Sequence, residues 1–529
     1  MSHFSLRGRG LAASALLGTT ALVAAAMVPL GSASAVDEVP AARAKQGTVN
    51  GVMDHLIRFE RIGDKHDGRA AGEPGYEASA KYVARKLRQA GFEPWMQEFD
   101  FPYYAETGPS KLERTAPDAK AYAEETDYIL MTYSGSGNVT DVTVEGVDLK
   151  LAEADRGSST SGCEAEDFAT FTAGNIALMQ RGACAFADKV VNAQEAGAVA
   201  AIVMNQGNNA GRMDAFAGTL GGPVATIPAL GTSFMVGEEL AAEGTKATVV
   251  TETESEIRQT WNVIADTRGR KANVVMAGAH LDSVHGANGI NDNGSGSAAL
   301  LEVAEKMGGD ARPNNRVRFA WWGAEELGLL GSEHYVADLS ERRPGKFQKI
   351  ALYLNFDMVG SPNYMLGVYD GDNSVYGPEE GAAIGPDGSA AIEAMFQDFF
   401  SVYGTGSSET PFSGRSDYGP FIALNVPAGG LFTGAEGVKT PEQAVQFGGT
   451  AGAAYDECYH SECDDLGNVS RDALKANTSA ILHAVQKYAR STRSVNGKDT
   501  GHEPPAPEAP RMAVRHHHAD GHDHGGVAR

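Results

Sequence analysis

Side chains that could bind a metal and move protons gather in four short stretches of this chain. They are imidazoles, carboxylates and one phenol: His280, Asp282 and Asp292, then Glu325 and Glu326, then Asp357, and finally Tyr459 and His460. Imidazoles and carboxylates are ligands that zinc accepts in proteins. A single His-x-Asp pair is more often part of a hydrogen-bonded loop. The repetition of such groups downstream instead indicates a metal site that could activate water.

Three of these stretches follow apolar runs that are typical of buried strands. The runs are residues 273–279, 316–322 and 350–356. Because open α/β sheets place their ligands at the carboxyl ends of the strands, we expect the ligand candidates to meet there. His280 and Asp282 project the same way because strand side chains alternate. Asp292 stands just before a helical pattern over residues 295–307.

Glu325 and Glu326 are neighbours where a strand turns into a helix, so their side chains cannot face the same way. One could therefore ligate a metal while the other accepts a proton. A simpler explanation, that acidic residues favour a helix N-terminus, accounts for either glutamate alone. An N-cap likewise accounts for Asp357 alone. Neither explains why neighbouring strands all end in this way.

The alternation of strands and helices predicts an α/β fold, a doubly wound mixed sheet with helices on both faces. Residues 262–266 provide another strong strand, and a helix over residues 76–91 is followed by a strand over residues 93–101. We expect residues 36–126 and 256–491 to build one main domain around an insert at residues 127–255. Residues 492–529 should form a disordered Pro/His-rich tail, in which the histidines from His516 to His524 could bind metal loosely.

The first 35 residues have the order of a secretory signal peptide. Arg7 and Arg9 precede an apolar region, and Ala33-Ser-Ala35 precedes the expected cleavage point. No later stretch is long and apolar enough to span a bilayer. The net charge of −24 argues against nucleic acid and anionic membranes as partners. We therefore expect a secreted, extracellular protein, and a monomer.

Export makes the four cysteines candidates for disulfides, which persist in oxidising compartments. Their spacing favours Cys163 with Cys184 and Cys458 with Cys463, and the other two connectivities remain open. The second pair would close a tight loop around His460.

Residues 174–204 predict a strand, a helix over residues 189–197 and a second strand. Here the chain resembles a protease-associated domain, a small β-rich insert beside a catalytic domain. The resemblance lies in Arg181-Gly182, Cys184, Phe186, Lys189 and the Ala-Gly-Ala that leads into the second strand. It implies no chemistry of its own.

The ligand-bearing stretches together resemble the secreted bacterial double-zinc aminopeptidases. The matching segments are His280-Leu-Asp-Ser-Val, Gly289-Ile-Asn-Asp292-Asn-Gly, Trp321-Trp-Gly-Ala-Glu-Glu326, Asn355-Phe-Asp357-Met, Gly414-Arg-Ser-Asp417, Gly429-Gly-Leu-Phe432 and Cys458-Tyr-His460, in the order of that family. The family usually has Arg-Ser-Asp-His, where this chain has Tyr418. That difference affects the expected substrate border and leaves the metal ligands unchanged.

The resemblance implies a role for each residue. His280 and Asp357 would hold one zinc ion, Glu326 and His460 the other, and Asp292 would bridge them. Asp282 would orient His280. The general base would be Glu325 and the oxyanion stabiliser Tyr459, with Arg415 and Phe432 at the substrate border. The cofactor is thus two zinc ions per chain, which would lower the pKa of a shared water.

The resulting hypothesis is a secreted enzyme that releases the N-terminal residue of peptides or proteins. A large apolar, leucine-like residue is expected because Phe432 and Phe421 should lie near the site. One alternative is a carboxypeptidase or dipeptidase on the same scaffold. Another is a non-catalytic, receptor-like binding protein, although such a protein need not keep a base and five ligands.

Overall fold

The structure is a computed structural model that describes residues 48–502. The predicted signal peptide and the His-rich stretch from His516 to His524 lie outside the described residues. Within residues 48–502, no helix is long and apolar enough to cross a membrane.

A mixed sheet carries the strands that lead into the candidate ligands. β9 (Arg270–His280) pairs in parallel with β10 (Asn315–Trp322) on one side and with β11 (Ile350–Phe356) on the other. β11 also pairs in parallel with β14 (Ala428–Phe432), and β12 (Gly367–Tyr369) joins β14 to β13 (Ser408–Thr410). β8 (Lys246–Asp266) runs antiparallel to β10. The predicted mixed sheet is confirmed, and the carboxyl ends of β9, β10 and β11 point to one edge of it.

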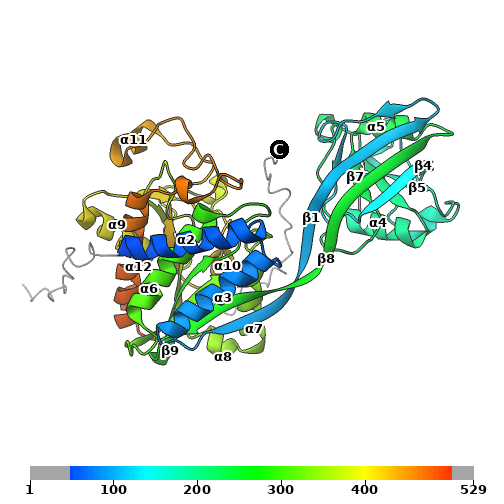
Figure 1. The fold of residues 1–529 in the computed structure, drawn as a ribbon. Coiled ribbons are helices and arrows are strands. Elements are labelled where there is room, and N and C mark those ends of the chain that lie inside the picture. Colours follow the sequence, from blue (N-terminus) through cyan, green and yellow to red (C-terminus); the bar gives the residue numbers. More distant parts are fainter. Residues whose placement is uncertain (1–47, 503–529) are drawn as a thin grey trace, which may run out of the picture. The chain divides into compact units, whose positions relative to one another are not determined.

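Helices cover both faces of this sheet. Val275 and Ala277 of β9 share a core with α2 (Thr48–His66), α3 (Pro74–Gln89), α6 (Gly296–Met307), α9 (Ser389–Tyr403) and α12 (Arg471–Arg490). The alternate residues Val274 and Met276 share a second core with α7 (Leu330–Arg342), α8 (Pro344–Phe347) and α10 (Gly419–Ala423). Because strand side chains alternate, these two cores lie on opposite faces. Figure 1 shows α2, α3, α6 and α12 grouped together.

The segment before the insert contributes directly to the first core. Tyr76, Ala80, Val83 and Leu87 of α3 are buried, as the helical spacing predicts. Each fully buried apolar side chain of this size contributes about 1.5–3 kcal/mol to folding. The helices of this segment therefore pack in the same core as the helices that follow the insert.

Two long strands connect the main sheet to the insert. β1 (Trp95–Ala116) pairs antiparallel with β8 from Trp95 opposite Ile264 to Ala116 opposite Lys246. The predicted strand over residues 93–101 therefore continues far beyond its expected end. The boundary that we placed between residues 255 and 256 falls inside β8, which no glycine or proline interrupts. Pairing with β1 satisfies the backbone of β8 along its length, so no loop is needed there.

The insert has its own small sheet, in the order β4–β5–β6–β7–β3. Its strands are β4 (Gly137–Gly146), β5 (Ile176–Gln180), β6 (Ala200–Met204), β7 (Ala229–Thr232) and β3 (Tyr128–Leu130), and the short β2 (Lys120–Ala121) pairs with β1. Two helices, α4 (Phe186–Glu195) and α5 (Phe234–Leu240), complete it. The strand–helix–strand order predicted over residues 174–204 is confirmed.

The ordered chain extends further toward the C-terminus than the sequence predicts. Beyond α11 (Pro441–Phe447) and α12, a short helix α13 (Arg493–Asn496) forms inside the segment expected to be disordered. Asn273 donates a hydrogen bond to Thr492 (2.9 Å) and accepts one from the backbone N–H of Gly501 (2.7 Å). The backbone N–H of His502 bonds to the carbonyl oxygen of Ile350. Hydrogen bonds to Asn273 and to the backbone hold this segment. The amino-acid composition of a segment does not reveal such bonds.

Candidate active site

His280, at the end of β9, faces two carboxylates from other parts of the chain. Its Nε2 atom lies 3.2 Å from Asp292 Oδ1 and 3.3 Å from Asp357 Oδ1. Asp292 stands between β9 and α6, and Asp357 directly follows β11. The imidazole of His280 is 1% exposed, so water does not compete for these contacts.

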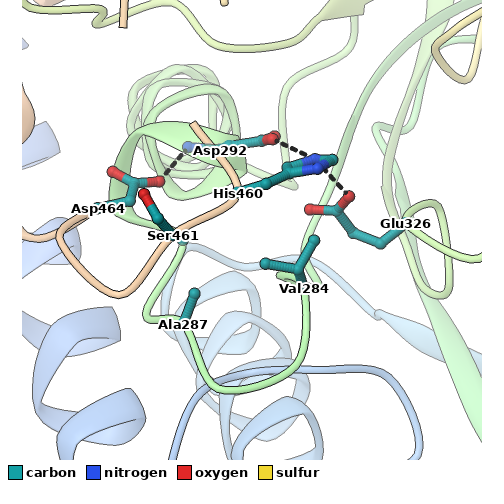
Figure 2. A pocket seen from close by; sticks show the side chains of 8 residues that line it. Val284, Ala287, Asp292, Glu326, His460, Ser461 and Asp464 are labelled. Atoms are coloured by element: carbon teal, nitrogen blue, oxygen red, sulfur yellow. Dashed lines mark hydrogen bonds and ion pairs between the residues drawn. The ribbon is translucent and has the colours of Figure 1, made fainter. Parts of the chain in front are cut away.

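A second histidine approaches the other side of Asp292. His460 Nε2 lies 3.3 Å from Asp292 Oδ2 and 3.0 Å from Glu326 Oε2. Asp292 thus presents one oxygen to each histidine. Figure 2 shows His460 between Asp292 and Glu326. All five predicted metal ligands therefore converge, in two groups that share Asp292.

The spacing of these donor atoms fits a pair of cations. Around a tetrahedral zinc ion with bonds of about 2.0–2.1 Å, neighbouring ligand atoms are roughly 3.3 Å apart, close to the distances found here. Glu326 Oε1 and Asp357 Oδ1 are buried and accept no hydrogen bond within residues 48–502. Buried carboxylate oxygens without a donor are costly, so a cation is the partner that this arrangement lacks.

Asp282 supports both ends of the site. Its carboxylate accepts the backbone N–H groups of Glu325 (3.2 Å) and Glu326 (3.3 Å), which fixes the turn that carries the two glutamates. Nδ1 of His280 lies 3.2 Å from the backbone carbonyl oxygen of Asp282 and 3.7 Å from its carboxylate. The predicted orienting role toward His280 stays a prediction, with the carbonyl oxygen as the closer partner.

Glu325 is placed to move a proton. It is buried to the same depth as the ligands, with Oε2 3.8 Å from His280 Nε2. Burial raises the pKa of Glu325 well above its usual range, and the carboxylates of Asp357 and Asp417 act in the same direction. Burial and the charge of Asp292 also raise the pKa of Glu326. A carboxylate with a raised pKa is suited to take and return a proton near neutral pH.

The loop that carries His460 is held in an unusual conformation. His460 has φ of 54°, in the left-handed region that residues other than glycine rarely adopt. Disulfides join Cys458 to Cys463 and Cys163 to Cys184, the pairing that the spacing favours. The ring of Tyr459 stacks on that of His460 with centroids 3.8 Å apart. This backbone strain lies at the candidate ligand, where such strain tends to collect.

Arg415 and Phe432 lie near the candidate ligands, and their role at the substrate border stays a prediction. Arg415 donates hydrogen bonds to the hydroxyl of Tyr459 (3.2 Å) and to Glu436 (2.7 Å). Phe432 is partly buried at the end of β14, beside β11 and hence near Asp357. The suggestion that Phe421 lies at the substrate is wrong. Phe421 is fully buried and stacks on Tyr353 with ring centroids 4.1 Å apart, because α10 packs against the sheet there.

Sequence reasoning missed two buried residues that hold the ligand loop. Arg69 donates to the carbonyl oxygens of Asn288 (2.7 Å), Leu281 (2.5 Å) and Gly289 (2.6 Å), at both ends of that loop. Asp464 accepts the backbone N–H of Asp292 at 2.9 Å. The position of Asp464, directly after Cys463 in the loop that carries His460, was a signal that it could lie near the site. None existed for Arg69, which lies in a glycine-rich turn more than two hundred positions away.

Comparison with known proteins decides the family. The sequence model of peptidase family M28 matches residues 262–485, and that of the PA domain matches residues 147–240, inside the predicted insert. An aminopeptidase from Pseudomonas aeruginosa (strain UCBPP-PA14) is 46% identical over 449 residues, which cover 84% of this chain and 82% of that relative. The chain belongs to peptidase family M28. It is a metallo-aminopeptidase with a protease-associated insert.

Two further aminopeptidases agree with this placement. Leucine aminopeptidase 2 from Trichophyton tonsurans is 42% identical over 461 residues, 84% of this chain and 86% of the relative. The solved aminopeptidase from Aneurinibacillus sp. strain AM-1 covers 88% of this chain and 98% of its own, with 25% identity and a TM-score of 0.57. The predicted resemblance to the aminopeptidases is confirmed.

Proposed function

We propose that this M28 aminopeptidase holds two zinc ions per chain and releases a large apolar, leucine-like residue from the N-terminus of peptides outside the cell. The observation that carries the proposal is the position of Asp292, whose two carboxylate oxygens lie 3.2 Å and 3.3 Å from two different histidines. A carboxylate shared in this way suits a bridge between two cations, because its charge offsets their mutual repulsion.

The residues divide into two ligand groups. His280 and Asp357 would hold one ion, His460 and Glu326 the other, and Asp292 both. Zinc accepts imidazole and carboxylate ligands. Calcium and magnesium prefer oxygen ligands, so the two imidazole nitrogens of this set favour zinc over them. When bound, a zinc pair polarises the scissile carbonyl and lowers the pKa of a water molecule.

Glu325 does the proton transfer in this proposal. Its carboxylate takes a proton from the attacking water and returns it to the nitrogen of the departing peptide, so it ends the cycle unchanged. The turn fixed by Asp282 holds Glu325 beside the ligands. The neighbouring glutamates have different tasks in this proposal, because Glu326 faces His460 and Glu325 lies nearer His280.

Tyr459 and the ligand cluster orient the two ends of the residue that is removed, its carbonyl oxygen and its amino group. The hydroxyl of Tyr459 accepts a hydrogen bond from Arg415, which leaves its own proton free to donate to the carbonyl oxygen as that oxygen becomes negative. The nitrogen of an unprotonated amino terminus is a ligand that bound zinc would accept, so the pocket would select the end of the peptide from which residues are removed.

Two observations support an apolar residue at the cleaved position. Val284 and Ala287 line the pocket beside His460, opposite the carboxylates (Figure 2). Such apolar walls favour a hydrocarbon side chain over a charged one. In addition, the Trichophyton tonsurans relative is named a leucine aminopeptidase.

Export is supported by the sequence rather than by the described residues. Residues 1–35 have the signal-peptide order, and all four cysteines pair in disulfides, which persist in oxidising compartments. Detection of the protein in culture medium, with a new N-terminus at residue 36, is the expected result. Retention in the cell with an intact leader contradicts it.

The experiment that tests the activity uses a panel of aminoacyl anilides and a matched pair of peptides. Leucine and phenylalanine anilides should be cleaved faster than glutamate or lysine anilides, and a chelator should stop all cleavage. An unblocked peptide should lose its first residue, while the same peptide with an acetylated N-terminus should remain intact. Release of the last residue from both peptides would instead identify a carboxypeptidase.

A further inference from the structure

A buried line of hydrogen bonds ends at the candidate ligand Asp357. The line runs from β10 through β11 to the loop before α10, and then to the residue that follows β11. Each side chain between Trp322 and Asp357 accepts one hydrogen bond and donates the next. Trp322 Nε1 donates to Tyr353 (2.8 Å), Tyr353 to Asn355 (2.9 Å), Asn355 to Ser416 (2.8 Å), and Ser416 to Asp357 Oδ2 (2.6 Å). None of the four residues before Asp357 has a role in the proposed reaction.

The donors of this line all point toward Asp357. Indole N–H can only donate, which fixes the direction at Trp322. The hydroxyl of Tyr353 must then donate onward to Asn355, and the amide of Asn355 to Ser416. The four residues before Asp357 are at most 4% exposed, so the bonds form in a medium of low dielectric where each one polarises the next.

Packing keeps the line in place. Tyr353 stacks face to face on Phe421, with an interplanar angle of 3°. Gly278 on β9 leaves room where the first two side chains meet, because a Cβ there would lie 2.4 Å from the Tyr353 hydroxyl and 2.6 Å from Trp322 Nε1. The line therefore packs against β9, the strand that delivers His280.

The consequence for Asp357 is a fixed choice of oxygen. Ser416 occupies Oδ2, and within residues 48–502 no hydrogen bond reaches Oδ1. Oδ1 instead faces His280 Nε2 at 3.3 Å. Loss of the Ser416 hydroxyl would free the carboxylate to rotate about its bond to Cβ and would leave Oδ2 buried without a donor.

The line ends in the first ligand group. Glu326 and His460 come from the turn after β10 and from the disulfide loop, whereas the last bond of the line is to Asp357. We propose that Ser416, Asn355 and Tyr353 are positioning residues that affect the affinity of the His280–Asp357 site more than that of the His460–Glu326 site. This inference rests on the proposed two-zinc function. It adds that the zinc affinities of the two sites depend on the line to different extents.

The test is a zinc titration of the full-length protein, in competition with a chromophoric chelator, for the wild type and three variants. Ser416→Ala should weaken binding of one ion about 10–100-fold and weaken binding of the other ion much less. Tyr353→Phe keeps the ring stacked on Phe421 but breaks the line further from Asp357, so a smaller loss at the same ion is expected. Ser389→Ala is the matched control, a buried serine whose hydroxyl accepts the N–H of Ala428 at 3.1 Å, off the line.

The titration separates the inference from the function on which it rests. Fewer than two ions in the wild type contradicts the proposed function. The inference is tested by the ratio of the zinc affinities of Ser416→Ala and the wild type, taken separately for each ion. Equal weakening of both ions, no weakening, or the same change in Ser389→Ala overturns it, because each of these results means that the serine serves general stability only. Thermal unfolding of the metal-loaded variants shows whether all are folded before they are compared.

Discussion

Arg415 donates a hydrogen bond from its guanidinium to the hydroxyl oxygen of Tyr459 at 3.2 Å. The sequence placed Arg415 at the substrate, yet its second branch pairs with Glu436 at 2.7 Å, so both of these contacts are within the protein. Tyr459 is thereby held over His460 with its proton available. Burial and the nearby carboxylates of Asp292 and Glu326 raise the pKa of Tyr459, which keeps the hydroxyl protonated and able to donate.

Tyr459→Phe should therefore lower kcat for leucine anilide about 10²–10³-fold and change KM little, since a donor that acts mainly in the transition state is removed. The zinc content should not change. Tyr455→Phe is a suitable control, because its hydroxyl bonds to Gln443 in the same part of the chain but away from the ligands. A normal kcat in Tyr459→Phe means that another group stabilises the oxyanion.

Glu325→Gln removes the proposed base without changing the size of the side chain. We expect kcat to fall by about 10²–10⁴-fold, or more if the glutamine also misplaces the water, with zinc binding retained. Rates on an aminoacyl anilide and the zinc content of the same preparation provide the check. If the activity stays near that of the wild type, Glu325 is not the base. If zinc is lost, it is a ligand.

Arg69→Met should destabilise the fold by about 3 kcal/mol, because three carbonyl oxygens each lose a donor. Arg69→Lys should recover only part of this, since an ammonium group cannot reach all three as a planar guanidinium does. Denaturant unfolding measures both changes. Arg61→Met on the exposed side of α2 should change stability by less than about 0.5 kcal/mol. Similar losses for Arg69→Met and Arg61→Met would contradict the role assigned to Arg69.

Glu393 on α9 gives a pH-dependent contribution to stability away from the candidate metal ligands. Burial raises the pKa of Glu393 from 4.5 to about 7, with the carboxylates of Asp372 and Glu409 acting in the same direction. Between these two values the folded protein binds more protons than the unfolded chain, so this stabilisation is complete below 4.5 and is lost as the pH rises through about 7.

Glu393→Gln removes the titration while keeping an acceptor for the backbone N–H of Gly371. The free energy of unfolding of the wild type, relative to this variant, should fall by up to about 3 kcal/mol between pH 4.5 and pH 8. Urea unfolding at several pH values measures the difference. If the difference does not vary with pH, Glu393 has an ordinary pKa in the folded protein.

The success of the sequence-based predictions depended on how local each signal was. Residues 350–356 are a short apolar run, and the strand found there has the same bounds. The ligands at its end and at the ends of β9 and β10 followed from the rule for open sheets. The helices α2 and α12 were missed although Val52, Leu56 and Phe59 have helical spacing.

Other features leave no local trace in the sequence. The length of β1 and β8 is set by their mutual pairing, which no residue type marks. Arg69 and Ser416 act through a backbone carbonyl or a carboxylate that is distant in sequence, and an arginine or a serine in a glycine-containing loop predicts nothing in particular. Such contacts become visible only when the chain is folded.

The shared carboxylate of Asp292 is the central claim, and the number of zinc ions per chain tests it most directly. Metal analysis after dialysis against a weak chelator should give two ions for the wild type and fewer than one for Asp292→Ala, because both ligand groups lose a donor at once. One ion in the wild type, or two ions retained in Asp292→Ala, would contradict a pair of metals joined through this residue.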